Sequence, residues 1–264
     1  MRVAVHFHLF YLESLPLVKK HLSHLASFPH DLYITVVQDN PASLEAARKH
    51  FPHAVIWQVP NRGYDVGPFI YFLQHIRLEN YDFVLKIHTK DNSPEPRVLC
   101  SLCLTNQKWM RTLLHALLGS PRIFAKNIKR FERDPKLGMI GSRYFVLNEA
   151  EHINYLLPRI RVEMKRLSAP MPKKKAFMAG TMFLMRSHLL QKFREVYSID
   201  DFAPTDPGKH DRTLAHIMER VFGFYTLCAG YTIRGFDRSL TFEYQHKIQK
   251  IRRFITKITT RHSK

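Results

Sequence analysis

Two short polar clusters in the first third of the chain carry residue types that can do chemistry. Residues 61–69, Asn-Arg-Gly-Tyr-Asp-Val-Gly-Pro-Phe, follow an apolar run, and residues 81–90 form a second apolar run that ends in His-Thr-Lys. In an α/β protein, ligands sit in the crevice outside the carboxyl ends of the strands. Two such clusters at strand–helix spacing predict a pocket for a nucleotide or sugar phosphate. The alternative is that the first cluster only forms a turn and the second is a solvated loop.

The elements that must position these clusters alternate between strand and helix patterns. Strands are expected at Val3–Phe10, Leu32–Val37, Val55–Val59, Tyr81–Ile87, Leu137–Ser142 and Phe177–Met185. Helices are expected at Leu15–Phe28, Leu44–Arg48 with Ser43 as its cap, Pro68–Arg77, Trp109–Leu118, Ile123–Phe131, Ala150–Leu167 and Arg212–Phe222. This order predicts an α/β fold of Rossmann type, with a mixed, mostly parallel sheet flanked by helices. Neither the Gly-x-Gly-x-x-Gly fingerprint nor a P-loop follows the first strand, which disfavours a dinucleotide cofactor.

The charge of the chain indicates an anionic partner. Its 264 residues include 41 Lys and Arg against 22 Asp and Glu, a formal net charge of +19. That balance favours nucleic acid, an anionic membrane face or a phosphorylated substrate, and charge alone does not separate them. The three cysteines do not form a disulfide framework, and neither a signal peptide nor an apolar run long enough to span a bilayer is visible. We therefore expect a cytoplasmic protein.

The last twenty or so residues have a pattern of their own. Residues 245–264 contain basic side chains and no acid, and isoleucines recur at Ile248, Ile251, Ile255 and Ile258. This spacing predicts a basic amphipathic helix, which suits a membrane interface rich in anionic lipid. The alternative is a helix docked on the body with its basic side in water. The first interpretation predicts a peripheral protein at the inner face of the cell membrane.

Four blocks of the sequence, taken in order, resemble the rhamnan-synthesis protein F family. They are residues 61–69, Lys-Ile-His-Thr-Lys at 86–90, Ala-Gly-Thr-Met-Phe at 179–183 and the segment 211–220. The resemblance runs from Val3 to about Phe222, and the second and third blocks are specific to the family. Members look like GT-A-type glycosyltransferases that build rhamnose-containing cell-surface polysaccharides from dTDP-rhamnose. Tyr64 departs from the pattern, because the family usually has Arg there.

The resemblance implies an inverting rhamnosyltransferase that uses dTDP-rhamnose to extend a lipid-linked cell-surface polysaccharide. It divides the chain into a transferase domain over residues 1–240 and a basic tail over 241–264. Within that domain, residues 1–95 would be the nucleotide-sugar-binding half and 96–240 the acceptor-side half. Transfer of another nucleotide-activated sugar is an alternative. A basic nucleic-acid-binding protein is an alternative of a different class, although no recognised nucleic-acid module is present.

On the donor side, the order of segments resembles the larger inverting GT-A group, in which a metal-binding Asp-x-Asp ends the fourth strand. Here His88-Thr89-Lys90 occupies that place. Because Lys and His can stabilise a diphosphate leaving group without a metal, we predict metal-independent transfer with His88 and Lys90 at the diphosphate and no cofactor. Dependence on Mg²⁺ or Mn²⁺ is the open alternative. The donor-binding residues expected are Asp39, Asn61, Arg62, Gly63, Asp65, Lys86 and Thr89.

On the acceptor side, Asp211 matches the group's general base, which deprotonates the acceptor hydroxyl. The alternative is that Asp211 is only a helix N-cap, and both roles are compatible. Asp206 is a reserve base. Trp109 is expected either to contact the acceptor or to anchor the core. The acceptor-side residues implied are Trp109, Arg111, Gly180, Thr181, His216, Glu219 and Arg220.

Overall fold

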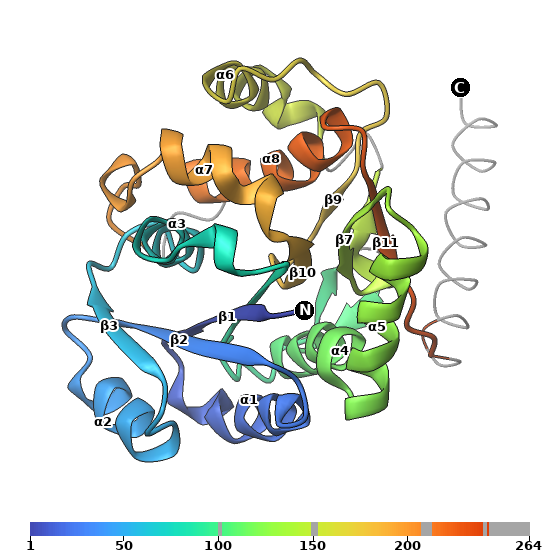
Figure 1. The fold of residues 1–264 in the computed structure, drawn as a ribbon. Helices are drawn as coiled ribbons and strands as arrows, with labels where there is room; N and C mark the ends of the chain where they lie inside the picture. The colour runs from blue at the N-terminus through green and yellow to red at the C-terminus, as the bar shows by residue number, and fades with distance from the viewer. Residues whose placement is uncertain (100–101, 149–152, 207–212, 240–241, 243–264) are drawn as a thin grey trace, which may run out of the picture.

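A computed structural model describes residues 1–99, 102–148, 153–206, 213–239 and 242 of the chain. The predicted amphipathic tail helix therefore lies outside the described residues. Within them the fold is the expected α/β arrangement, a central sheet flanked by helices (Figure 1). The sheet has the strand order β11-β7-β10-β4-β1-β2-β3. Its strands are β1 Val3–Leu9, β2 His30–Val37, β3 Val55–Val59, β4 Phe83–His88, β7 Leu137–Gly141, β10 Phe183–Arg186 and β11 Thr232–Gly235.

The sheet is parallel except around one strand. β10 pairs antiparallel with both β4 and β7, and the other neighbours run parallel. Strands β1 and β4 are buried along their whole length, as expected for strands covered on both faces. Strands β1 to β4 come from residues 1–95, and β7, β10 and β11 from residues 96–240 complete the same sheet. The two halves expected from the sequence thus share one sheet.

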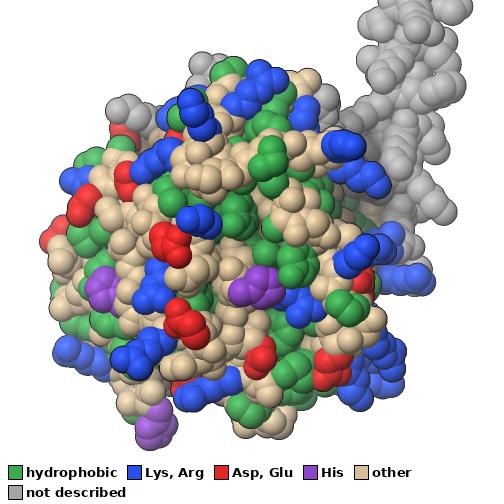
Figure 2. All heavy atoms as spheres, turned by 45° about the horizontal axis from the view of Figure 1, so that its top comes forward, with side chains coloured by type: hydrophobic (Ala, Val, Ile, Leu, Met, Phe, Trp, Pro, Cys, Tyr) green, Lys and Arg blue, Asp and Glu red, His purple; other side chains and the backbone are tan. Residues whose placement is uncertain are grey.

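Helices cover both faces of the sheet, as Figure 1 shows. One face carries α1, α2, α4 and α5, while α3, α7 and α8 cover the other, and α6 packs outside them on α8. Figure 2 shows Lys and Arg side chains spread over the surface, with fewer Asp and Glu between them. The helices are α1 Leu15–Leu22, α2 Pro41–His50, α3 Val66–His75, α4 Asn106–Leu118, α5 Pro121–Arg133, α6 Leu157–Arg166, α7 Gln191–Val196 and α8 Leu214–Cys228.

The predicted strand Phe177–Met185 is wrong as one element. It is split into β9, Phe177–Met178, and β10, and the residues between them turn the chain. The turn requires two successive left-handed residues, Gly180 at φ +86° and Thr181 at φ +48°. Gly tolerates such a φ and Thr rarely does. A Cβ on Gly180 would also lie 2.9 Å from the Trp109 ring, so this glycine marks a close approach of the backbone to that ring.

Several helix limits differ from those predicted. The cap of α2 is Asn40, whose side-chain oxygen accepts the Ser43 backbone N–H at 3.0 Å, so Ser43 is not the cap. The helix predicted from Leu15 to Phe28 ends at Leu22 and continues as a short 3-10 turn, Ser23–Leu25.

Limits near the pocket described below also shift. Helix α4 begins before Trp109 because Thr105 caps it. Of the predicted helix Ala150–Leu167, residues 150–152 lie outside the described residues, and α6 starts at Leu157. Pro158 occupies its first turn, where proline is tolerated. Further elements were not predicted: α7, β11, the strand β8, Val146–Leu147, and the antiparallel pair of β5, Arg97–Leu99, with β6, Leu102–Leu104.

Candidate functional site

A buried ion pair joins three parts of the chain. Lys86 in β4 is fully buried, and its ammonium donates to the Asp65 carboxylate and, at 3.0 Å, to the Thr181 carbonyl oxygen. The Thr181 hydroxyl donates to the same carboxylate oxygen of Asp65. Asp65 immediately precedes α3, and Thr181 belongs to the turn between β9 and β10. We call these three residues the Asp65–Lys86–Thr181 anchor.

The charges of the anchor balance inside the protein. Burial alone would raise the pKa of Asp65, but His88, Lys86 and Lys90 around it hold that pKa well below its ordinary value. Burial lowers the pKa of Lys86, and the Asp65 carboxylate opposes that shift. A buried ion pair must be well hydrogen-bonded to offset the cost of desolvation. The anchor meets this condition through Thr181, which supplies both an acceptor and a donor.

Buried histidines lie beside the anchor. Strands β1 and β4 pair in a register that sets His6 opposite Lys86 and His8 opposite His88. Nε2 of His6 lies 2.9 Å and Nδ1 of His8 lies 3.0 Å from the Thr35 hydroxyl. Burial lowers the pKa of all three histidines, to about 4 for His8 and well below 6.5 for the other two. They are therefore neutral at pH 7.

A hollow opens above the anchor, beyond the carboxyl end of β4. Its volume is about 240 Å³. This is the edge of a parallel sheet at which ligands bind in α/β proteins. The side chains around it come from the start of α3, the first turns of α4 and α8 and the β9–β10 turn. Its lining residues are Tyr64, Asp65, Val66, Lys90, Trp109, Gly180, Thr181, Ala215, His216, Glu219 and Arg220.

Lys90 and Trp109 lie next to each other in the wall of this pocket. The Lys90 ammonium lies 3.9 Å from the centre of the Trp109 ring, a cation–π contact. It makes neither a hydrogen bond nor an ion pair with any described residue. Nε1 of Trp109 is buried without a hydrogen-bond partner in the described chain. Burial lowers the pKa of Lys90, and Asp65 and Glu219 oppose that shift.

Glu219 holds the β9–β10 turn from the side opposite the anchor. One of its oxygens accepts the Gly180 N–H at 2.6 Å, and the other accepts from Arg220. Arg220 also donates to the His216 carbonyl oxygen at 3.0 Å and lies over the Phe177 ring. Residues held in sparsely populated backbone conformations persist only where their surroundings fix them. Glu219 and the anchor together fix Gly180 and Thr181.

Some predicted donor-side residues have structural partners instead of lining the pocket. The Arg62 guanidinium donates to the Phe202 carbonyl oxygen at 2.9 Å. The Thr89 hydroxyl accepts the backbone N–H groups of Phe10 and Tyr11 at 3.0 and 2.9 Å, which ties the end of β1 to that of β4.

The remaining predicted residues lie at several places. Asn61 and Gly63 bond through their backbones to the segment 203–205. Asp39 and Arg111 are exposed and do not line the pocket. Asp211 lies outside the described residues. Asp65, Lys90, Trp109, Gly180, Thr181, His216, Glu219 and Arg220 do meet in the pocket, with Lys86 and His88 beneath it.

Two features of the site were not among the predicted site residues. Tyr64, known from the sequence as a departure from the family pattern, has φ +56° and forms part of the wall. Its ring contacts that of His216, and its hydroxyl donates to the Asp206 carbonyl oxygen at 2.9 Å. The row of His6 and His8 beside Lys86 and His88 was also missed. The sequence pattern that could have indicated this row is the His-x-His pair in β1, because alternate residues of a strand share one face.

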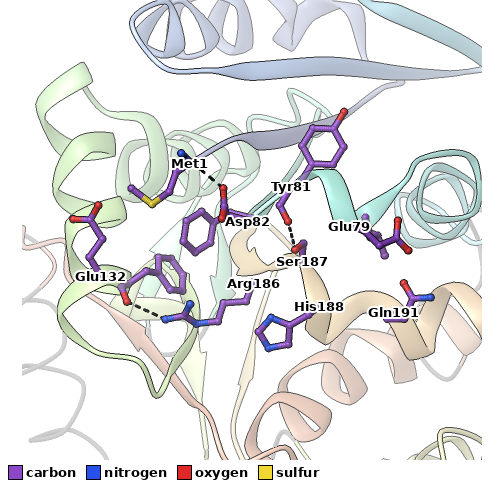
Figure 3. A pocket seen from close by; sticks show the side chains of 12 residues that line it. Met1, Glu79, Tyr81, Asp82, Glu132, Arg186, Ser187, His188 and Gln191 are labelled. Atoms are coloured by element: carbon purple, nitrogen blue, oxygen red, sulfur yellow. Dashed lines mark hydrogen bonds and ion pairs between the residues drawn. The ribbon is translucent and has the colours of Figure 1, made fainter.

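A larger cavity of about 510 Å³ lies at the opposite edge of the sheet. Figure 3 shows Tyr81, Asp82 and Arg186 in its wall, at the beginning of β4 and the end of β10. The Arg186 guanidinium is bonded to backbone carbonyl oxygens, among them that of Phe131 at 2.9 Å. None of the predicted site residues lines it. We assign the candidate site to the smaller pocket, because its position and unpaired donors suit a ligand.

The family of the chain follows from comparison with known proteins. The family model of rhamnan synthesis protein F matches residues 1–231. The chain belongs to this family. Membership implies a role in polysaccharide synthesis. Two relatives, both named uncharacterized protein WxcX, come from strains B100 and ATCC 33913 of Xanthomonas campestris pv. campestris. Each is 26% identical over 181 residues, which are 68% of this chain and 25% of the relative. The match therefore spans about a quarter of the length of those relatives.

Two properties of the described residues bear on metal and membrane. No group of three His, Cys, Asp or Glu side chains among them could hold a metal ion. Asp211 lies outside these residues, and metal independence stays a prediction. In the same part of the chain, no helix is both long and apolar enough to cross a membrane.

Removal of one charge from the anchor tests its role in stability. We expect Asp65→Asn to lower the free energy of unfolding by about 3–5 kcal/mol, because it leaves the Lys86 ammonium buried without a counter-charge. The double variant Asp65→Asn/Lys86→Met removes both charges and should recover most of that loss. Urea unfolding of the three proteins measures both effects. A double variant as unstable as the single one would contradict the assignment.

The buried histidines predict a loss of stability on mild acidification. Their folded pKa values lie below the ordinary 6.5, so the unfolded chain binds protons first as the pH falls. The free energy of unfolding should be unaffected by them above pH 6.5. Between pH 6.5 and about 4, His8 should lower it by about 1.4 kcal/mol per pH unit. His6 and His88 should lower it further below pH 6.5, since their pKa values are lowered in the same direction. Urea titrations at a series of pH values measure this slope.

The variant His8→Gln is the control for that slope. Glutamine does not titrate, so its slope should be smaller than that of the natural chain by about one proton, about 1.4 kcal/mol per pH unit. The low pKa of Asp65 acts in a different window: its stabilising charge is lost only when the pH falls below about 4. An unchanged slope in His8→Gln would show that His8 is already protonated in the folded protein.

Proposed function

We propose that the chain is a glycosyltransferase that binds a nucleotide-activated sugar with its diphosphate at Lys90. The observation that carries the proposal is the Lys90 ammonium in the pocket beyond β4, which has no carboxylate partner among the described residues. A partly buried cation that forms no ion pair favours an anionic ligand. Family membership, which implies polysaccharide synthesis, supports a sugar nucleotide as that ligand.

The pocket can stabilise a departing diphosphate. Negative charge develops on the leaving group during transfer, and preorganised positive groups that face it lower the barrier. Lys90 supplies the charge. Lys86 takes part only indirectly, since its ammonium is bonded to Asp65 and Thr181. His88 is neutral at pH 7 because burial lowers its pKa. It is therefore proposed as a neutral neighbour of the diphosphate.

For the acceptor we propose Asp211 as the general base. It lies outside the described residues, and in sequence it comes just before α8, whose first turns line the pocket. The Glu219 carboxylate is a poorer candidate, since both of its oxygens are hydrogen-bonded to Gly180 and Arg220. Inversion at the sugar carbon, dTDP-rhamnose as donor and a lipid-linked glycan as acceptor follow from the family resemblance. They complete the proposal, together with attachment of the tail to an anionic membrane.

A donor panel tests the proposed reaction. The protein is incubated with dTDP-rhamnose, other dTDP-sugars and UDP-sugars, with and without EDTA, and release of the nucleoside diphosphate is measured. We expect release from one of these donors, and release that persists in EDTA. Absence of both binding and turnover with every donor would overturn the transferase proposal. Loss of activity in EDTA alone would overturn metal independence.

Lys90→Ala in the same assay tests the key residue. Its rate should fall by about 10²–10³, the usual cost of removing one group that stabilises the transition state. The control is Lys108→Ala, which removes an exposed lysine of α4 outside the pocket and should keep the rate unchanged. Equal rates for the two variants would remove Lys90 from the site.

A further inference from the structure

The segment around α6 is strongly basic. Residues 153–175 include the 3-10 turn Asn154–Leu156, helix α6 and the loop that follows it. They carry one acid, Glu163. The Glu163 side chain is turned inward, where it accepts from the Tyr197 hydroxyl at 2.8 Å and pairs with Arg166. The basic residues of the segment are Arg159, Arg161, Lys165, Arg166, Lys173, Lys174 and Lys175.

The same surface exposes large apolar side chains. Val162 of α6 is 57% exposed and Tyr155 is 43% exposed, two of the few large apolar residues so exposed in the described chain. Arg161 and Lys165 flank Val162 on the outer side of the helix and form no ion pair with any described residue. Apolar side chains among unpaired basic ones are the pattern of a helix that lies in a membrane interface.

The fold presents this surface outward. Helix α6 buries Ile160 and Met164 on the side that packs on α8 and exposes the opposite side. In Figure 1 it is the outermost helix of its layer. In Figure 2 Lys and Arg side chains lie among hydrophobic ones in the upper part of the view, where that layer comes forward. We call the exposed side of residues 153–175 the α6 face.

We propose that the α6 face docks on an anionic lipid bilayer, with Val162 and Tyr155 at the level of the headgroups. Each basic residue held near such a surface contributes electrostatic attraction, and the apolar side chains add burial. Charge complementarity alone would also suit nucleic acid. The exposed Val162 at the centre of the face favours lipid, because a solvated phosphate backbone offers it no apolar contact.

The α6 face continues into the wall of the candidate pocket. The Tyr155 hydroxyl accepts from the Arg220 guanidinium at 3.3 Å, and Arg220 lines the pocket. Docking by this face would hold the pocket next to the bilayer, where a membrane-bound acceptor is within reach. The docking itself does not depend on the proposed transfer reaction, since vesicle binding is measured without substrate. A negative result for membrane docking therefore does not overturn the proposed transfer reaction, and the reverse also holds.

Vesicle binding of the full chain tests the proposal. Flotation with phosphatidylcholine vesicles is compared with flotation after about 30% phosphatidylglycerol is included, at physiological salt. We expect binding only to the anionic vesicles. The variant Arg161→Glu/Lys165→Glu should bind them at least about 30-fold more weakly, the factor given by about 1 kcal/mol for each basic residue lost. Val162→Asp should also weaken binding.

The control is Arg48→Glu/Lys49→Glu, which makes the same charge change on exposed residues of α2, at the other side of the sheet. It should bind like the natural chain, and melting temperatures confirm that each variant is folded. Equal loss in both double variants would show attraction by net charge alone and overturn the proposal. Unchanged binding in Arg161→Glu/Lys165→Glu would show that another part of the chain binds the vesicles, and it would overturn the proposal for the α6 face. Binding to duplex DNA in place of vesicles, weakened by the same variant, would make nucleic acid the partner of this face.

Discussion

The buried ion pair between Asp65 and Lys86 is the interaction on which the site depends. It joins the start of α3, the centre of the sheet and the β9–β10 turn, three parts that lie far apart in sequence. Neither charge is stable in the interior without the other. The pair therefore fixes how α3 and the turn meet the end of β4. Glu219 accepts a hydrogen bond from the Gly180 N–H. The β9–β10 turn at the base of the pocket is therefore held both by the anchor and by Glu219.

The charged groups around the Asp65–Lys86 pair are of two kinds. Some are bonded to protein groups and hold the structure together, and others are open to a ligand. Lys86, Asp65 and Glu219 are bonded to protein groups, and the buried histidines are neutral at pH 7. Lys90 follows β4 and lies beyond these contacts, over Trp109. Within the pocket, its charge is not compensated by an ion pair with any described residue. This placement supports the proposal that Lys90 binds an anion.

The sequence patterns predicted which segments form helices and strands more accurately than they predicted the contacts between those segments. Strand β3 has the predicted limits. The split of Phe177–Met185 was missed, because the two left-handed residues are stabilised by Lys86, Asp65 and Glu219 from distant segments. The structural bonds of Arg62 and Thr89 were missed for the same reason: their partners are backbone groups of residues 202 and 10–11.

We propose that Lys90 binds the diphosphate above the Asp65–Lys86–Thr181 anchor. Calorimetric titration of the natural chain and of Lys90→Met with dTDP measures this binding directly, without the acceptor or the transfer step. The variant should bind the diphosphate at least about tenfold more weakly, the factor for about 1.4 kcal/mol, with an unchanged melting temperature. Equal affinities for the two proteins would contradict it.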